Sequence, residues 1–337
     1  MREFIHHSNT SKLIINIITI LLLIVSIGLS VSYGSTNIAL GTVWQAVFHF
    51  NPEITTHQVI QELRLPRAFS AALVGAFLAV SGAIMQGMTR NPLASPSIMG
   101  VTDGAAFALV LMLAFFPTIS TMGLISSSFI GAGLAVGLVF MIGSFSPSGL
   151  TPVKLALAGV AIGTMLRSIS SILSLHFNLE KQMGFWLAGG LDGSSWTSVT
   201  ILFISGAIGL FIAVVISKSI TVLSLGEDMA TGLGQNNLMI KLFGILSILI
   251  LTGAAVSVAG PVGFVGLIVP HITRFIIGTD YRWIIPSSIL FGALLLVLAD
   301  VVSRLVNAPF ETPVGAITSL IGVPFFLYLA RGSGGGK

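Results

Sequence analysis

Within the apolar run over residues 153–177, four polar residues have types and a spacing that could carry function. Thr164, Arg167, Ser168 and Ser171 follow three- and four-residue spacings, so a helix places them on one face. Hydrocarbon cannot solvate a guanidinium, so a buried Arg167 needs water, a partner or an anionic passenger. The hydroxyls have a simpler explanation, which is bonding back to their own helix. The arginine favours a face turned away from lipid.

Motifs for bond-making chemistry are absent from the sequence. There is no GxxxxGK[ST] phosphate loop, and the terminal GSGGGK has the wrong spacing and no strand ahead of it. GxGxxG, HExxH and G-x-S-x-G are also absent. The chain has no cysteine, and its adjacent His6 and His7 lie in a terminal tail to which we assign no metal. We therefore expect neither catalysis nor a resident cofactor or metal, and energy must come from a partner.

The composition places the whole chain in a membrane. Hydrophobic residues make up 54% and charged residues 8%, and the mean hydropathy is +1.02. The net charge of +4 does not indicate a nucleic-acid partner, because the basic residues are scattered between apolar runs. The positions of the basic residues instead indicate how the chain is oriented in the membrane.

Ten apolar runs are each near the roughly 20 residues that a hydrocarbon core of about 30 Å requires. The run at 262–277 is short and contains Pro270. No linker or charge run marks a boundary, so we expect residues 1–337 to form a single transmembrane domain. The runs are 13–33, 68–88, 98–116, 122–145, 153–177, 198–216, 238–258, 262–277, 284–302 and 314–330.

The basic residues predict the orientation of these ten spans. With the N-terminus inside, most of them fall on the cytoplasmic side and both termini are cytoplasmic. The outer side receives only four basic residues, which are Arg64, Arg67, Lys181 and Arg304.

The second run carries a row of small residues. Ala71, Gly75, Ala79, Ala83 and Gly87 recur at every fourth position, which puts them on one helical face. Such a face lets another backbone approach closely in a membrane. We therefore expect this helix to be a packing centre.

Several motifs together resemble the FecCD family, the membrane permeases of binding-protein-dependent ABC importers for iron chelates, haem and cobalamin. The resemblance covers nearly the whole chain, with the motifs in the same order. It implies an all-α fold like that of cobalamin-importer permeases, with two pseudo-symmetric five-helix halves. The motifs are RLPR at 64–67, SGAIMQG at 81–87, NPLASP at 91–96, SLGEDMATGLG at 224–234, GFVGLIVPHITR at 263–274 and ADVVSRL at 299–305.

The resemblance also implies roles for the outer arginines and for the fifth helix. In the family, arginines in RLPR and ADVVSRL receive acidic residues of an extracytoplasmic substrate-binding protein, which here indicates Arg64, Arg67 and Arg304. The alternative is that these side chains extend to lipid phosphates. The fifth helix of the family lines the translocation pathway, which assigns Thr164, Arg167, Ser168 and Ser171 to that pathway.

On the cytoplasmic side the resemblance implies a coupling segment and a gate. Residues 219–237 form the longest inner polar stretch, and its glycines are expected to divide it into two short helical turns that bind an ATPase. The alternative is a solvated loop. The implied coupling residues are Ser224, Gly226, Glu227, Asp228, Gly232 and Gly234, and the implied gate residues are Asn91, Leu93 and Thr151.

The favoured hypothesis is a permease subunit in a bacterial cytoplasmic membrane, in contact with lipid. Its partners would be a second permease subunit, identical or related, two ATPase subunits that bind ATP and Mg, and the binding protein. The expected passenger is a ferric siderophore, with haem, cobalamin or another metal chelate as alternatives. An ion-coupled transporter would need an intramembrane relay, for which only Asp103, Asp300 and His271 are available. A membrane-embedded enzyme has only the polar face of residues 153–177 in its favour.

Overall fold

The computed structural model describes residues 8–34, 36–144, 152–308 and 310–333, and the regular structure in these ranges is entirely helical. Seven helices are long and apolar enough to cross a membrane, and three shorter helices are also apolar. Each overlaps one predicted run, so the prediction of an all-α polytopic membrane protein is confirmed. The long helices are α1 (Asn9–Ser32), α4 (Leu65–Thr89), α6 (Thr121–Ser144), α7 (Pro152–His176), α9 (Trp196–Leu225), α11 (Asn237–Ala259) and α13 (Tyr281–Leu305). The shorter ones are α5 (Val101–Phe115), α12 (Val265–Ile277) and α14 (Val314–Ser333).

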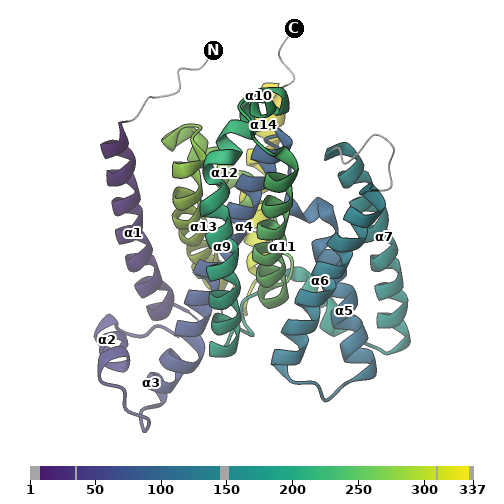
Figure 1. Ribbon diagram of the computed structural model, residues 1–337. Coiled ribbons are helices and arrows are strands. Elements are labelled where there is room, and N and C mark those ends of the chain that lie inside the picture. The colour runs from purple at the N-terminus through teal and green to yellow at the C-terminus, as the bar shows by residue number, and fades with distance from the viewer. Residues whose placement is uncertain (1–7, 35, 145–151, 309, 334–337) are drawn as a thin grey trace.

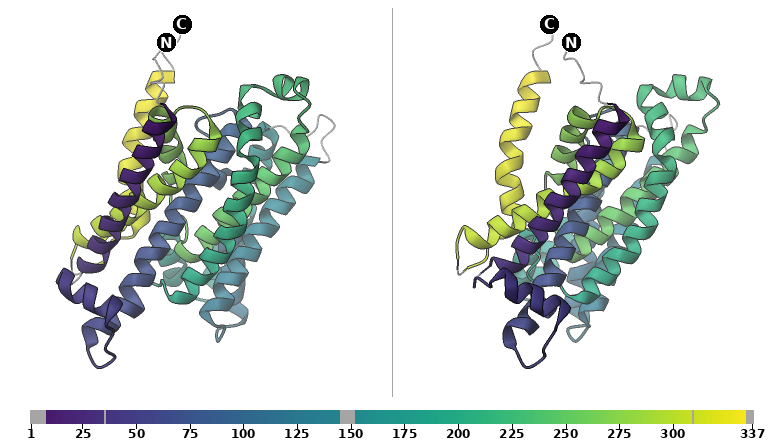
Figure 2. Two further views of the ribbon diagram at one scale, coloured as in Figure 1. Left: turned by 60° about the vertical axis from the view of Figure 1, so that its left-hand side comes forward. Right: turned by 90° about the vertical axis from the view of Figure 1, so that its left-hand side faces the viewer.

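Helix α4 lies at the centre of the bundle (Figures 1 and 2), with α9, α11, α12 and α13 packed around it. Helix α1 lies outside α13, while α5, α6 and α7 form the other flank. Two short segments extend α4 backward, namely α3 (Thr55–Val59) and a π-helical turn at Ile60–Arg64. One continuous helical rod therefore runs from Thr55 to Thr89.

The two ends of the bundle differ. The short helix α10 (Glu227–Gly232) lies at the end where α1 begins and α14 ends, and α2 (Leu40–Phe48) and α3 lie at the opposite end (Figure 1). We call these the α10 end and the α2 end. Arg64 precedes α4 at the α2 end, and Ser224 lies in the last turn of α9 at the α10 end. They lie at opposite ends, as the predicted ten crossings require.

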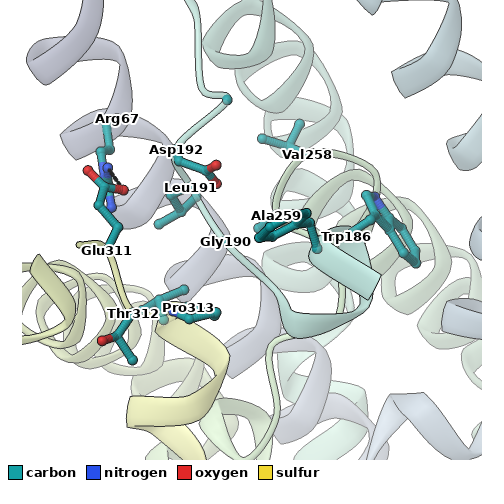
Figure 3. Close-up of a pocket in the computed structure, with 13 residues that line it drawn as sticks. Arg67, Trp186, Gly190, Leu191, Asp192, Val258, Ala259, Glu311, Thr312 and Pro313 are labelled. Carbon is teal, nitrogen blue, oxygen red and sulfur yellow. Dashed lines mark hydrogen bonds and ion pairs between the residues drawn. The ribbon is translucent and has the colours of Figure 1, made fainter. Parts of the chain in front are cut away.

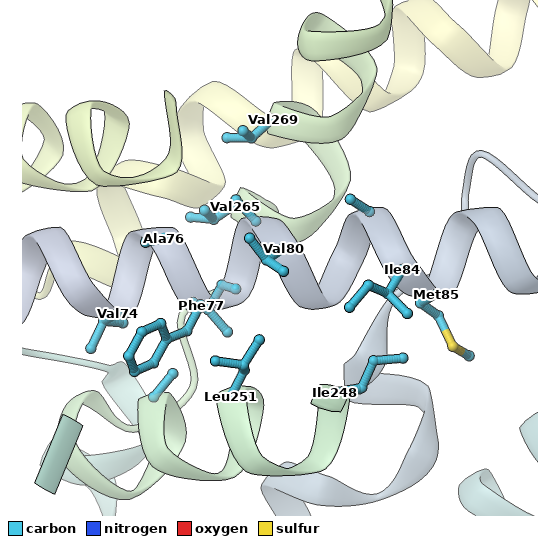
Figure 4. Packing of buried hydrophobic residues seen from close by; sticks show 14 of the residues in the cluster. Val74, Ala76, Phe77, Val80, Ile84, Met85, Ile248, Leu251, Val265 and Val269 are labelled. Atoms are coloured by element: carbon cyan, nitrogen blue, oxygen red, sulfur yellow. The ribbon is translucent and has the colours of Figure 1, made fainter. Parts of the chain in front are cut away.

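Close backbone contacts explain why α4 is central. Its Val74, Phe77 and Ile84 pack against Ile248 and Leu251 of α11 (Figure 4). On another side, a Cβ atom at Gly75 would overlap the carbonyl of Gly292 in α13, and one at Gly82 would overlap the carbonyl of Gly266 in α12. In a membrane such close approach supplies the packing energy that hydrophobic burial supplies in water. The predicted packing role of α4 is therefore confirmed at Gly75, and Gly82 adds a second close contact.

Two of the short helices each follow a residue in the left-handed backbone conformation. Gly100, with φ of 74°, precedes α5, and Phe264, with φ of 66°, precedes α12. The ring of Phe264 lies against Gly322 of α14, where any side chain would overlap it. Irregular backbone is tolerated at membrane depth where it is buried in protein or lines a water-filled cavity. Helices α5 and α12 are the third and eighth of the ten spans, the positions that two related five-helix halves would give them.

Candidate functional site

Arg67 is the centre of a charged cluster at the α2 end. Its Nε lies 3.0 Å from Oδ1 of Asp300 in α13, and its Nη1 lies 2.7 Å from Oε2 of Glu311. The Asp300 side chain is fully buried, that of Arg67 is 12% exposed and that of Glu311 is 42% exposed. Arg67 therefore connects a buried carboxylate to one at the surface.

Arg64 and Arg304 are both buried and bind the end of α1. The guanidinium of Arg64 donates to the carbonyls of Val31 (2.7 Å) and Ser32, and that of Arg304 donates to those of Ser30 (3.0 Å) and Tyr33. The last carbonyls of a helix lack partners within the helix and carry a partial negative charge. These two arginines therefore fasten α1 to α4 and α13. Docking at Arg64 and Arg304 remains a prediction.

A pocket of about 400 Å³ opens beside this cluster (Figure 3). It lies between the start of α4, the end of α8 (Glu180–Ala188), the end of α11 and the start of α14. Arg67, Asp192 and Glu311 give it a charged side, and Trp186 gives it an aromatic one. Sequence reasoning missed this pocket, because its walls come from four segments that are far apart in the chain.

The polar face of α7 has the predicted composition but a different environment. Thr164, Ser168 and Ser171 are exposed, and each hydroxyl donates to the carbonyl four residues earlier at 2.7–2.9 Å. The sequence suggested that Arg167 is buried, and this is wrong. Its side chain is 72% exposed, and its Nη2 lies 2.9 Å from Oδ1 of Asp103 in α5. Helix α7 lies at the edge of the bundle (Figure 1), and all four residues of this face are exposed.

The segment at residues 219–237 contains one short helix, and the expectation of two is wrong. Helix α9 continues to Leu225, because Ile220 and Leu223 are buried against the core, and it stops at Gly226, whose φ is 139°. Helix α10 follows and contains Glu227, Asp228 and Gly232, and Gly234 with φ of 79° lies in the turn after it. Ser224 belongs to α9.

Helix α10 offers an exposed surface with apolar and acidic parts. Met229 and Leu233 are 60% and 70% exposed, and Asp228 is exposed beside them. Glu227 is paired instead: its side chain is 44% exposed, and its Oε1 lies 2.7 Å from Nζ of Lys241 in α11. A Cβ atom at Gly232 would meet no atom within 4 Å. Substitution there would change the surface of α10 without straining its packing.

The predicted gate residues lie at the same end. Arg90 ends α4 in a left-handed conformation, and Oδ1 of Asn91 then accepts the N–H of Leu93 at 2.9 Å. Thr151 lies outside the described residues. The predicted sites thus fall into three separate places, which are the α2 end, the α10 end and the outward face of α7.

The fold and these surfaces define a polytopic membrane transporter whose two ends and one lateral face are available to other molecules. The chain belongs to the FecCD transport family, whose model matches residues 22–332. It is a multi-pass membrane permease of the metal-chelate ABC importer class.

Individual relatives agree with this assignment. The chain is 61% identical to the iron(3+)-hydroxamate import system permease protein FhuB of Bacillus subtilis (strain 168), over 90% of this chain and 79% of that one. It is 46% identical to the iron-uptake system permease protein FeuB of the same organism, over 92% and 93%. Among solved structures, an inward-facing metal-chelate type ABC transporter matches with a TM-score of 0.83 and 31% identity, over 94% of this chain and 98% of that one.

Proposed function

We propose that this chain carries a ferric siderophore of the hydroxamate class across the cytoplasmic membrane of a bacterium. The observation that supports this substrate is the 61% identity to a permease named for iron(3+)-hydroxamate import. The driving force would be ATP hydrolysis on a separate subunit, because this sequence contains no nucleotide-binding motif.

The proposed orientation puts the α10 end in the cytoplasm, with both termini there. Basic residues are concentrated toward that end, as the positive-inside rule expects of a cytoplasmic surface. They include Lys12 near the start of α1, Arg90 after α4, Lys218 near the end of α9, Lys241 in the first turns of α11 and Arg331 near the end of α14.

The proposed assembly uses each of the three places. Two ATPase subunits that bind ATP and Mg would dock at the α10 ends of a permease pair, where Met229 and Leu233 are exposed. A substrate-binding protein would dock at the α2 end, where Arg67 reaches the surface. A second permease subunit would face α7, so that Thr164, Arg167, Ser168 and Ser171 line a shared pathway. Asn91 and Leu93 would close its cytoplasmic end.

An ion-coupled mechanism receives less support. Of the two carboxylates weighed for a relay, Asp103 is paired with Arg167 and Asp300 with both Arg67 and Arg304. These ion pairs join α5 to α7 and α4 to α13, so both carboxylates hold helices together. His271 lies on α12 against the ring of Phe325, with its ring centroid 5.6 Å away.

Uptake of radioactive iron tests the substrate. A bacterial strain without ferric-chelate permeases would express this chain with its ATPase and binding protein. We expect uptake from a ferric hydroxamate and little from ferric citrate, a ferric catecholate or haem. Preference for another chelate would overturn the substrate assignment, and lack of uptake from all of them would overturn the proposed function.

Thiol labelling tests the pathway, and the chain suits it because it contains no native cysteine. We expect Arg167→Cys and Ser168→Cys to react with a membrane-impermeant thiol reagent in the assembled transporter, because a pathway holds water. Met165→Cys is the control, since Met165 is also exposed but lies about 100° around α7 from Thr164, toward lipid. If Arg167→Cys and Ser168→Cys react no faster than Met165→Cys, the pathway lies elsewhere.

A further inference from the structure

The last turns of α9 are joined to the first turn of α13 by a hydroxyl group. Oγ1 of Thr221 accepts the backbone N–H of Tyr281 at 2.9 Å and lies 3.3 Å from Oδ1 of Asp280. Thr221 is five residues before Gly226, where α9 gives way to α10. The connection therefore lies close to the proposed ATPase-binding surface.

This bond is part of how α13 begins. The first N–H groups of a helix have no partner within the helix, and a side chain from another helix satisfies one of them here. Asp280 caps the same turn by accepting the N–H of Arg282 at 3.0 Å. Burial alone would raise the pKa of Asp280, but hydrogen bonds from Arg282, its charge and the Thr221 hydroxyl lower it, so the carboxylate stays charged at neutral pH. Movement of the end of α9 would therefore disturb the start of α13 directly.

The side chain of Tyr281 extends the connection to α4. It is 3% exposed and fills a notch at Gly87, where a Cβ atom would lie 2.6 Å from the phenol oxygen and 2.7 Å from Cγ2 of Ile220 in α9. Three helices thus meet at this point without free space. Close-packed interiors transmit displacement because they have few voids to absorb it.

From Tyr281 the contacts continue to the short helix α12. The guanidinium of Arg274, in the last turn of α12, donates to Oε1 of Gln86 in α4, the residue before the Gly87 notch that Tyr281 fills. Nε2 of Gln86 donates to the carbonyl of Gly266 in the first turn of α12, at 3.2 Å. Both ends of α12 are thereby tied to the junction of α4, α9 and α13.

We infer that Thr221 and Tyr281 form the joint through which movement of α9 and α10 is passed to α13 and α12. The inference rests on the proposed function, in which ATPase subunits bind the α10 end. Thr221 is a positioning residue: it holds α13 to the moving segment and contacts neither nucleotide nor chelate. Two distant sites are coupled when both bias the position of the same structural element. Here that element would be the joint, and the two sites would be the ATPase-binding surface and the chelate pathway.

The test is Thr221→Val in the complete transporter, reconstituted in liposomes, with chelate uptake and ATP hydrolysis measured together. We expect ATP hydrolysis to continue while the chelate transported per ATP falls at least about fivefold, the lower range of coupling between sites. Thr221→Ser keeps the hydroxyl and should restore the ratio. Thr200→Val is the matched control, because Thr200 is on the same helix and its hydroxyl bonds only the carbonyl of Trp196.

Each other outcome has a definite meaning. If Thr221→Val transported as much chelate per ATP as the unsubstituted transporter, the inference that Thr221 forms a joint would be wrong. A parallel loss of uptake and hydrolysis, with a lower melting temperature, would show that Thr221 is merely structural and would also overturn it. Absence of ATP-dependent uptake by the unsubstituted transporter would instead be a failure of the proposed function.

Discussion

Gly82→Leu is expected to prevent the accumulation of folded permease. Position 82 faces the carbonyl of Gly266, so even a methyl group would overlap backbone, and a leucine would force α4 and α12 apart. Overpacking a close-packed interior typically costs about 1–3 kcal/mol and sometimes more, and here the obstructing atoms cannot change rotamer. The milder Gly82→Ala should give protein with a clearly reduced melting temperature. Both are measured by size-exclusion chromatography and thermal unfolding in detergent.

Gly28→Ala provides the control for this prediction. Gly28 also lies within a membrane helix, α1, but a Cβ atom there would meet nothing within 4 Å. We expect its melting temperature to match the unsubstituted protein. If Gly82→Ala and Gly28→Ala melted together, α4 and α12 would not be in backbone contact, and the description of α4 as the packing centre would be wrong.

Arg67→Glu is expected to abolish uptake. Reversing this charge places a third carboxylate beside Asp300 and Glu311, and it removes the cation offered to the binding protein. Loss of one member of a hydrogen-bonded buried charge pair costs on the order of 2–5 kcal/mol, so association with the binding protein should weaken at least about tenfold. Association is measured on purified permease captured in nanodiscs. The amount of each variant permease in the cell membrane is compared with that of the unsubstituted protein, as a check that the variant folds.

The double variant Arg67→Glu with Glu311→Arg separates docking from internal pairing. It restores an ion pair between positions 67 and 311 but leaves a carboxylate where the binding protein would meet a guanidinium. We expect stability to recover only in part, because the carboxylate at position 67 still lies beside Asp300, and we expect association to stay weak. Recovery of association would mean that Arg67 serves only the internal pair. Arg304→Glu is a poorer test, since it would also release the carbonyls of Ser30 and Tyr33.

The sequence predicted the helices well because their determinants are local. Each span needs only a run of apolar residues of membrane length, and the close contact of α4 with α13 follows from a four-residue repeat of small side chains. The end of α9 was misplaced because Ser219, Thr221 and Ser224 look polar. They are helical because Ile220 and Leu223 between them are buried by α4 and α13, and a sequence does not display such tertiary contacts.

The environment of the charged residues was harder to predict. Arg64 donates to backbone carbonyls at the end of α1, and Arg304 donates to carbonyls there as well as pairing with Asp300. No residue type marks a carbonyl as an acceptor. Arg167 finds Asp103 in another helix, 64 residues away. Residue type indicated that these side chains need partners, but only the three-dimensional arrangement shows which partners they have.

We propose that this chain has no energy source of its own and is moved by an attached ATPase. The most direct test uses liposomes that contain the permease and its ATPase, with binding protein and a radiolabelled ferric hydroxamate on the side of the α2 end. We predict uptake only when ATP is supplied at the α10 end, with no effect of an ionophore that collapses ion gradients. Uptake by the permease alone that the ionophore abolishes would contradict the account.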